Sequence, residues 1–382
     1  MCYLKRFRKK VQRYLFEGIF SIKPPIFNPM DKGSYKVLGV MSGTSLDGID
    51  LAIADYRCSE RGVWSCDFVY ATTEPYDSQW KERLKNGHLL QSAELEALDK
   101  DYTNYLGAVI HRFIRSHTDQ QLDFVASHGH TILHQPEIGL TLQIGNRPEL
   151  RELVGLPVVC DFRVQDVQLG GQGAPLVPIG DRLLFGFYDS CLNLGGFANC
   201  SFEQQNQRIA FDICPVNIVL NALAERLGYE YDKGGALARS GAQIPELLDR
   251  LDGLPFYQAP APKSLGLEWV IENVHPILSD YPQAKTEDLL CTFTEHIARQ
   301  LGEQLPKGRC LVSGGGAYNE YLIERLKVHS QARIEVPGDW LIDNKEALVF
   351  GLLGALRWRG EVNCLSSVTG ASRDHSSGVI FR

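Results

Sequence analysis

The chain has 382 residues, with 44% hydrophobic and 22% charged residues, and its 46 acidic and 39 basic side chains give a formal net charge of −7 at neutral pH. This length exceeds what one hydrophobic core usually serves, so we expect two lobes, and the ordinary composition excludes wholesale disorder. The acidic balance argues against a nucleic-acid partner recruited by bulk charge. No apolar run reaches the ~18–20 residues that span a bilayer, so we expect no transmembrane segment.

Ten cysteines are scattered along the chain without a C-x-x-C pair. Cys160, Cys191 and Cys310 stand inside apolar runs that are typical of strands. Unpaired cysteines in such runs usually behave as small, buried hydrophobic residues, and they stay reduced in a reducing compartment. The pattern therefore predicts a cytoplasmic protein.

We expect residues 1–33 to form a basic leader that is flexible or not native. Its first thirteen residues carry six bases, and Pro24, Pro25 and Pro29 separate it from the body, with Met30 just before the first strong strand. A basic amphipathic helix on an anionic membrane is the alternative.

The body opens with a strand at 36–41, a small-residue turn at 42–48 and a second strand at 49–54. A similar hairpin follows 153 residues later (195 minus 42), with strands at 191–194 and 200–202 around the turn 195–199. This recurrence predicts a duplicated, two-lobe α/β fold with a central cleft. We expect lobe 1 to comprise 34–160 plus 365–382, and lobe 2 to comprise 161–364.

Each hairpin is followed by an apolar strand with a polar end, at 124–126 and at 209–211, which we take as equivalent. Helical patterns cover 218–228 and 286–305. A third glycine turn at 314–316 joins a strand to a helix that starts near Asn319, so its backbone can approach a nucleotide closely.

Several common nucleotide and hydrolase motifs are missing. The sequence has no G-x-x-x-x-G-K-[ST], its triple glycine is not G-x-G-x-x-G, and the run around Ser45 misses the last glycine of G-x-S-x-G. The first turn instead offers backbone N–H groups and the hydroxyls of Thr44 and Ser45 to phosphate oxygens. Asp47 and Asp50 can hold Mg²⁺ through water. The alternative is that these glycines serve only tight turns.

Two further polar stretches suggest contacts to a substrate. His128, His130 and His134 could converge on zinc, but the intervening Gly129 and the absence of a neighbouring cysteine or carboxylate favour recognition of a polar substrate. The stretch 161–175 is polar and glycine-rich at the expected lobe junction, where pockets are common, although it could equally be a hinge.

Asp212 directly follows an apolar strand, which is where a general base directed into a cleft belongs. The alternative is that Asp212 caps the helix that begins near Val216.

Eight strings in order resemble one family, the anhydro-N-acetylmuramic acid kinases of the actin/Hsp70/sugar-kinase superfamily, from about Val37 to Phe381. They are GVMSGTSLDGID at 39–50, SHGHTILHQP at 127–136, TLQIGN at 141–146, DFRVQDVQLGGQGAPLVP at 161–178, LNLGGFAN at 192–199, PKSLG at 262–266, SGGGAYN at 313–319 and SVTGAS at 367–372.

The resemblance implies the two-lobe actin-like ATPase fold, which is a duplicated ribonuclease H-like fold with a central cleft. It also implies an ATP- and Mg²⁺-dependent enzyme of peptidoglycan recycling. Water adds at C1 of a 1,6-anhydro amino sugar, the bridge opens, and O6 receives the phosphoryl group, which gives N-acetylmuramic acid 6-phosphate. By resemblance the catalytic residues are Asp212 and Glu346, and a homodimer is implied. Nucleotide contacts are expected from Gly43, Thr44, Ser45, Asp47, Gly48, Gly195, Gly196, Gly314, Gly315 and Gly316. Sugar contacts are expected from Thr131, Arg163, His128 and Gln172, and a Mg²⁺ contact through water is expected from Asp47.

Two departures bear on the substrate. The family's G-P-G-N reads Cys214-Pro215-Val216-Asn217 here, and the arginine-rich run after Asp161 is thinner. A kinase for an open-ring amino sugar is therefore the alternative function. A nucleotide-driven clamp without enzymatic activity is a second alternative, disfavoured because we expect no client domain after lobe 2.

Overall fold

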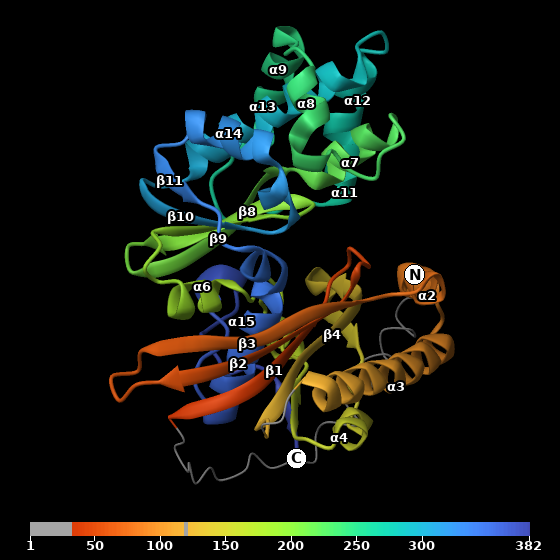
Figure 1. Ribbon diagram of the computed structural model, residues 1–382, viewed down its shortest axis with the longest axis vertical. Coiled ribbons are helices and arrows are strands. Elements are labelled where there is room, and N and C mark those ends of the chain that lie inside the picture. The colour runs from red at the N-terminus through yellow and green to blue at the C-terminus, as the bar shows by residue number, and fades with distance from the viewer. Residues whose placement is uncertain (1–32, 118–120) are drawn as a thin grey trace. The chain divides into compact units, whose positions relative to one another are not determined.

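The computed structural model describes residues 33–117 and 121–382, so the predicted leader up to residue 32 lies outside the described residues. The chain divides into two compact units (Figure 1). Unit 1 contains the described residues up to Ala174 together with Glu346–Ser366 and Gly370–Arg382. Unit 2 contains Pro175–Lys345 and Ser367–Thr369.

Unit 1 is built on a seven-stranded mixed sheet. Its strands are β1 (Ser34–Ser42), β2 (Gly48–Cys58), β3 (Trp64–Pro75), β4 (Phe124–Gln135), β5 (Leu140–Ile144), β6 (Val158–Cys160) and β12 (Val379–Phe381). Its helices are α2 (Ser78–Asn86), α3 (Ser92–His117), α4 (Glu149–Val154), α5 (Val164–Gln168) and most of α15 (Asp339–Arg359). The strand order is β12-β6-β4-β1-β2-β3, and β5 pairs with β4.

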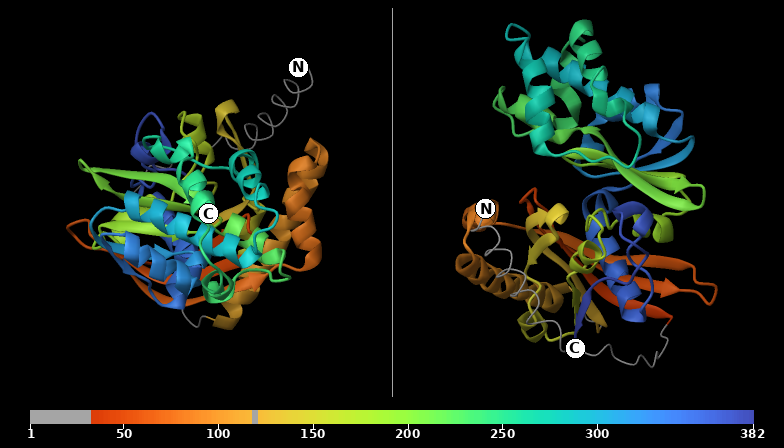
Figure 2. Two further views of the ribbon diagram at one scale, coloured as in Figure 1. Left: turned by 90° about the horizontal axis from the view of Figure 1, so that it is seen from above. Right: turned by 180° about the vertical axis from the view of Figure 1, so that it is seen from behind.

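The alternation of side chains along β1 explains why helices cover both faces of this sheet (Figure 2). Leu38 and Val40 belong to the hydrophobic core that includes buried residues of α3. Gly39 points to the other face, where a Cβ would overlap the carbonyl group of Ala347 in α15. Gly351 and Gly354 of α15 likewise lie against the strands, so α15 can approach the sheet closely.

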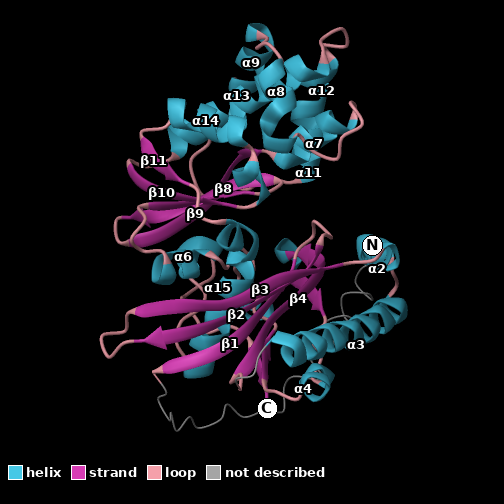
Figure 3. Cartoon of the chain, viewed as in Figure 1, coloured by secondary structure: helices cyan, strands magenta, loops and turns pink. Residues whose placement is uncertain are grey.

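Unit 2 is built on a five-stranded sheet (Figure 3). Its strands are β7 (Ser190–Leu194), β8 (Phe197–Gln204), β9 (Gln207–Pro215), β10 (Gly308–Ser313) and β11 (Ala332–Glu335). Its helices are α6 (Pro178–Leu184), α7 (Asn217–Glu225), α8 (Ala236–Ser240), α9 (Pro245–Asp252), α10 (Pro255–Gln258), α11 (Leu267–Trp269), α12 (His275–Ser279), α13 (Thr286–Gln304) and α14 (Glu320–His329), and α16 (Ser366–Thr369) lies mostly in this unit.

A separate hydrophobic core holds unit 2 together. The central helix α13 contributes Leu290, Phe293 and Leu301, all fully buried, and α13 contacts α7, α8, α9 and α14. The apolar spacing at 218–228 and 286–305 therefore correctly indicated helices.

Both units share one topology, which confirms the predicted duplicated α/β fold. In unit 1 the order β3-β2-β1-β4-β6 contains two antiparallel pairs followed by two parallel pairs. In unit 2 the order β9-β8-β7-β10-β11 repeats this pattern. This is the strand order of a ribonuclease H-like fold. A central cleft stays a prediction.

One predicted equivalence is wrong. The strand at 124–126 belongs to β4, which pairs parallel to β1, whereas the strand at 209–211 belongs to β9, which pairs antiparallel to β8. The counterpart of β9 is β3, which sequence reasoning missed. Most of β3 is exposed or partly exposed, so the strand lacks an apolar pattern.

The boundaries between the units also differ from the expected ones. Residues 161–174 and 346–364 group with unit 1. The reason is packing: α15 lies on the first sheet, and the N–H of Gly173 donates to Asp166 within the same unit. No helix in the described part of the chain is long and apolar enough to cross a membrane.

Candidate active site

The turn between β1 and β2 presents polar side chains outward. Thr44, Ser45 and Asp47 are exposed, and the N–H of Leu46 donates to the carbonyl of Gly43 at 3.3 Å. Leu46 adopts a φ of 62°, a left-handed conformation that tightens the turn. Two hydroxyls and a carboxylate on one exposed turn suit contacts to phosphate oxygens and to a hydrated cation.

Gly48 differs from the other candidates of this turn. It lies inside β2 and is buried, and a Cβ there would overlap the carbonyl of Glu74 in β3. Close packing between two strands therefore accounts for a glycine at this position without any ligand.

A buried hydroxyl network supports the end of β1. The Oγ of Ser42 lies 2.7 Å from Nδ1 of His130 and 2.7 Å from the hydroxyl of Tyr76, which lies 2.5 Å from the hydroxyl of Tyr102. Burial lowers the pKa of His130 to about 4, so this imidazole is neutral at physiological pH. His130 therefore holds the strand before the turn.

Two sugar-side candidates, Arg163 and His128, meet within unit 1. Nε of Arg163 donates to Nε2 of His128 at 2.8 Å, so the neutral His128 carries its proton on Nδ1, 2.9 Å from the carbonyl of Gly129. Burial and the charge of Arg163 hold the pKa of His128 well below its ordinary value. Burial lowers the pKa of Arg163, and the negative charge of Glu346 only partly opposes this.

The other two sugar-side candidates have looser surroundings. Oγ1 of Thr131 accepts a long hydrogen bond of 3.4 Å from Nε2 of Gln143. Gln172 is exposed in the glycine loop, one residue before Gly173, whose carbonyl accepts from Arg163 at 2.7 Å. The loop thus places Gln172 beside the Arg163 group.

The three histidines of β4 each have a hydrogen-bond partner within the protein. His128 and His130 are held as described above, and Nδ1 of His134 lies 3.1 Å from the hydroxyl of Thr141. The three-ligand group found among the described residues lies elsewhere and contains none of these histidines.

In unit 2 two glycine turns lie together. A Cβ on Gly314, which has a φ of 81°, would meet the side chain of Asn193 at 2.5 Å, and a Cβ on Gly316 would meet Leu194 at 2.8 Å. Gly195 and Gly196 follow Leu194 directly. Gly196 and Gly315 are exposed, so the two turns together form a platform of accessible backbone.

The two residues that replace family glycines face inward. Cys214 and Val216 are both fully buried in the core of unit 2. The N–H of Val216 donates to the carbonyl of Gly196 at 2.8 Å, and the N–H of Asn217 donates to that of Gly195 at 3.3 Å. The start of α7 is thus tied to the glycine turn, and these N–H groups are already used.

The PKSLG segment holds Asp212 in place. Oδ2 of Asp212 accepts from the N–H of Leu265 at 2.8 Å, and its own N–H donates to the carbonyl of Lys263 at 3.0 Å. Nζ of Lys263 in turn donates to the carbonyls of Phe256 and Tyr257 at 3.0 and 3.3 Å. Sequence reasoning quoted this string but assigned it no role.

Burial raises the pKa of Asp212, and the hydrogen bond from Leu265 only partly opposes this. A carboxylate whose pKa is raised toward neutrality is a better general base. Asp212 does not cap α7, because the N-cap residue is Val216 and its side chain makes no capping bond. The helix-cap alternative is therefore wrong.

The candidate site residues therefore fall into two groups, one in each unit. Asp212 and the glycines of residues 195–196 and 314–316 belong to unit 2, whereas the first turn, Glu346 and the sugar-side candidates belong to unit 1.

Comparison with known proteins gives one consistent result. Residues 35–382 match the family model described as anhydro-N-acetylmuramic acid kinase. A relative of that name from Aliivibrio fischeri is 34% identical over 371 residues, covering 91% of this chain and 99% of the relative. Another of that name from Pseudomonas putida is 34% identical over 368 residues, covering 90% of this chain and 98% of the relative. The chain therefore belongs to the anhydro-N-acetylmuramic acid kinase family.

Proposed function

We propose that this protein uses ATP to convert 1,6-anhydro-N-acetylmuramic acid to N-acetylmuramic acid 6-phosphate in peptidoglycan recycling. Water adds its oxygen to C1, the C1–O6 bond breaks, and O6 takes the γ-phosphoryl group of ATP. The observation that carries this proposal is the setting of Asp212, a partly buried carboxylate with a raised pKa, held by the PKSLG segment in a chain of this family.

In this mechanism Asp212 removes the proton from the attacking water. A general base contributes about 10²–10⁴-fold to such a step. In unit 1, Arg163 has the charge that suits the acidic lactyl group of the sugar, while His128 accepts a hydrogen bond from the guanidinium and Glu346 attracts it. Thr131 and Gln172 supply further hydrogen bonds to the sugar.

The nucleotide is bound by backbone and hydroxyl groups. Gly196 and Gly315 offer exposed backbone, and Thr44 and Ser45 offer hydroxyls. Asp47 fits a hydrated Mg²⁺ because it is an exposed carboxylate on the same turn. When bound, Mg²⁺ would neutralise charge on the phosphates. Gly43, Gly195, Gly314 and Gly316 shape these turns.

A reaction in water enriched in oxygen-18 tests the function. Protein, ATP and Mg²⁺ are incubated with the 1,6-anhydro sugar, and the promptly quenched product is weighed by mass spectrometry. The proposal expects one heavy oxygen at C1 together with a 6-phosphate. Failure with this sugar, combined with phosphorylation of reducing N-acetylmuramic acid, would instead establish the open-ring kinase.

We further propose a cytoplasmic location and a homodimer. All nine described cysteines, from Cys58 to Cys364, are thiols, which fits a reducing compartment. The dimer rests on the family resemblance. Light scattering of the eluting protein during size-exclusion chromatography would show a monomer mass if the dimer proposal is wrong.

A further inference from the structure

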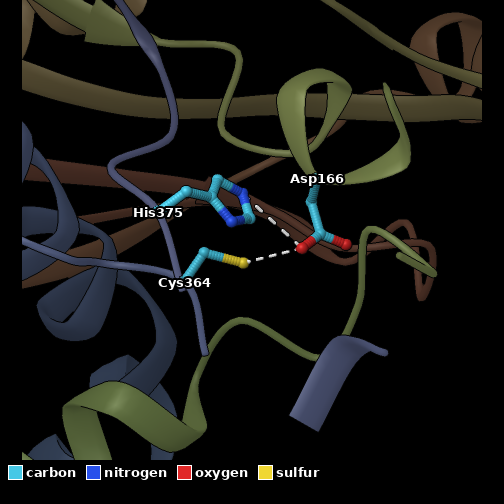
Figure 4. A group of neighbouring side chains, drawn as sticks. All are labelled: Asp166, Cys364 and His375. Atoms are coloured by element: carbon cyan, nitrogen blue, oxygen red, sulfur yellow. Dashed lines mark hydrogen bonds and ion pairs between the residues drawn. The ribbon is translucent and has the colours of Figure 1, made fainter. Parts of the chain in front are cut away.

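A cluster of three buried side chains in unit 1 contains none of the residues to which a role was assigned above (Figure 4). Asp166 of α5, Cys364 and His375 are 0%, 1% and 6% exposed. The Sγ of Cys364 lies 3.0 Å from Oδ1 of Asp166, and Nε2 of His375 lies 3.6 Å from the same oxygen. One ligand atom from each residue lies within 4.8 Å of the other two.

The backbone holds these three residues in register. Cys364 and His375 form an isolated antiparallel bridge, and each N–H donates to the other residue's carbonyl at 3.1 Å. Residues paired in this way project their side chains to the same face. Oδ2 of Asp166 accepts from the N–H of Gly173 at 2.6 Å, which directs Oδ1 toward the other two side chains.

His375 has an unsatisfied nitrogen within this cluster. Its Nδ1 lies 3.1 Å from the carbonyl of Arg373 and therefore carries a proton. Its Nε2 is buried and has no hydrogen-bond partner. In the neutral imidazole the lone pair of Nε2 thus faces a carboxylate oxygen, so two acceptors oppose each other. A cation that accepts electron pairs from both removes this conflict.

We propose that Asp166, Cys364 and His375 bind a Zn²⁺ ion. Thiolate, imidazole and carboxylate are the donors that zinc takes in proteins, and three side chains leave one tetrahedral position for water. The hydrogen bond from His375 to Arg373 and the one from Gly173 to Asp166 are the outer contacts that orient metal ligands.

Charge balance is consistent with a divalent cation. Binding releases the thiol proton of Cys364, so two anionic ligands neutralise the ion, and affinity increases with pH. Asp166 and Cys364 also attract the nearby Arg163, whose remaining anionic neighbour is Glu346. The ion would tie the 163–173 segment, which contains Arg163 and Gln172, to the C-terminal segment around His375.

Metal content of the full-length protein tests the site. Protein from zinc-supplemented cells, dialysed against a weak chelator, should retain one zinc per chain. After metal removal, Co²⁺ should produce a thiolate-to-cobalt charge-transfer band. Cys364→Ser and His375→Asn should each weaken binding at least about tenfold. Cys66→Ser and His88→Asn, which change residues outside the cluster, should bind as the wild type does.

A measurement on the wild type avoids any dependence on variant folding. X-ray absorption at the zinc edge should show one sulfur neighbour at about 2.3 Å and the rest nitrogen or oxygen. A folded wild-type protein without zinc or a cobalt band would overturn the proposal. So would a cobalt band that persists unchanged in Cys364→Ser.

Discussion

Burial favours the neutral form of two side chains in and near the candidate site. It raises the pKa of Asp212, so this carboxylate holds its proton more tightly, and it lowers the pKa of His130 to about 4. In both cases the cost of removing a charge from water is the largest cause. The raised pKa of Asp212 predicts an effect on turnover, and the lowered pKa of His130 predicts an effect on stability in acid.

Replacing Asp212 by Asn should reduce turnover by about 10²–10⁴-fold, because the amide cannot accept a proton from water. ATP affinity should be unchanged, since the proposed base acts on water. Steady-state rates and calorimetric titration with ATP measure the two effects.

The matched control is Asp249→Asn, which changes an exposed aspartate of α9 and should have wild-type kinetics. At pH 7 the Asp212→Asn protein should also unfold at a higher temperature, because a carboxylate with a raised folded pKa destabilises the fold once ionised. Loss of ATP affinity with turnover intact would refute the assigned role.

Acid should destabilise the protein through His130. The unfolded imidazole takes up a proton near pH 6.5, whereas the folded one does so near pH 4. This contribution to stability is therefore present above pH 6.5 and is lost as the pH falls to about 4, on the order of 3 kcal/mol.

Denaturant unfolding across this pH range measures the effect. The His130→Asn variant should lose less stability between pH 6.5 and 4 than the wild type, although its stability at pH 7 is lower. His88→Asn, at an exposed position, should keep the wild-type slope. Identical slopes in all three proteins would contradict the prediction.

At the scale of elements, glycines in β1 and α15 allow the backbone of this helix to pack closely on the first sheet. Gly39 of β1 lies against the carbonyl of Ala347, and Gly351 lies against the ring of Tyr56, whose hydroxyl donates to the carbonyl of Leu348 at 2.5 Å. Close contact between a helix backbone and a sheet requires such positions. Glu346 directly precedes Ala347 in α15, so this packing fixes its position relative to the sheet.

Gly39→Ala should therefore destabilise unit 1 by about 1–3 kcal/mol or more, because the added methyl group would overlap backbone that is not free to move. Equilibrium unfolding in urea measures the loss. Gly33→Ala is the control, since a Cβ there meets its nearest atom, the carbonyl oxygen of Cys58, at an ordinary 3.5 Å. Equal stabilities of the two variants would show that α15 tolerates the displacement.

At the scale of the whole molecule, the chain folds one topology twice around separate cores. The first core includes Leu106 of α3, and the second includes Leu290 of α13, both at most 1% exposed. Separate cores allow the two units to open as separate cooperative units.

We expect Leu290→Ala to lower the free energy of unfolding of unit 2 by about 2–5 kcal/mol. The substitution should also accelerate hydrogen exchange of the backbone amides within unit 2. Amides of β1 and β4 should exchange as in the wild type. Leu106→Ala is the reciprocal variant and should accelerate exchange in unit 1 alone. Mass spectrometry of peptides after exchange distinguishes the units, and acceleration in both by either variant would indicate a single cooperative fold.

The features that depend on local patterns could be predicted from the amino-acid sequence alone. Small residues between apolar runs predicted both hairpins, helical spacing predicted α7 and α13, and family strings identified the chain before its fold was described. The spacing of 153 residues between the hairpins indicated the duplication. Asp212 was also proposed as a catalytic base in this way, because an acidic residue that directly follows an apolar strand can be recognised from the sequence alone.

Only the tertiary structure decided what depends on contacts distant in sequence. The exposed strand β3 has no apolar pattern, and the packing of α15 on the first sheet moved the unit boundary. The hydrogen bond from Leu265 to Asp212 joins residues 53 positions apart, and the one from Cys364 to Asp166 joins residues 198 positions apart. Local patterns record which face of an element is buried, but not which distant side chain lies against it.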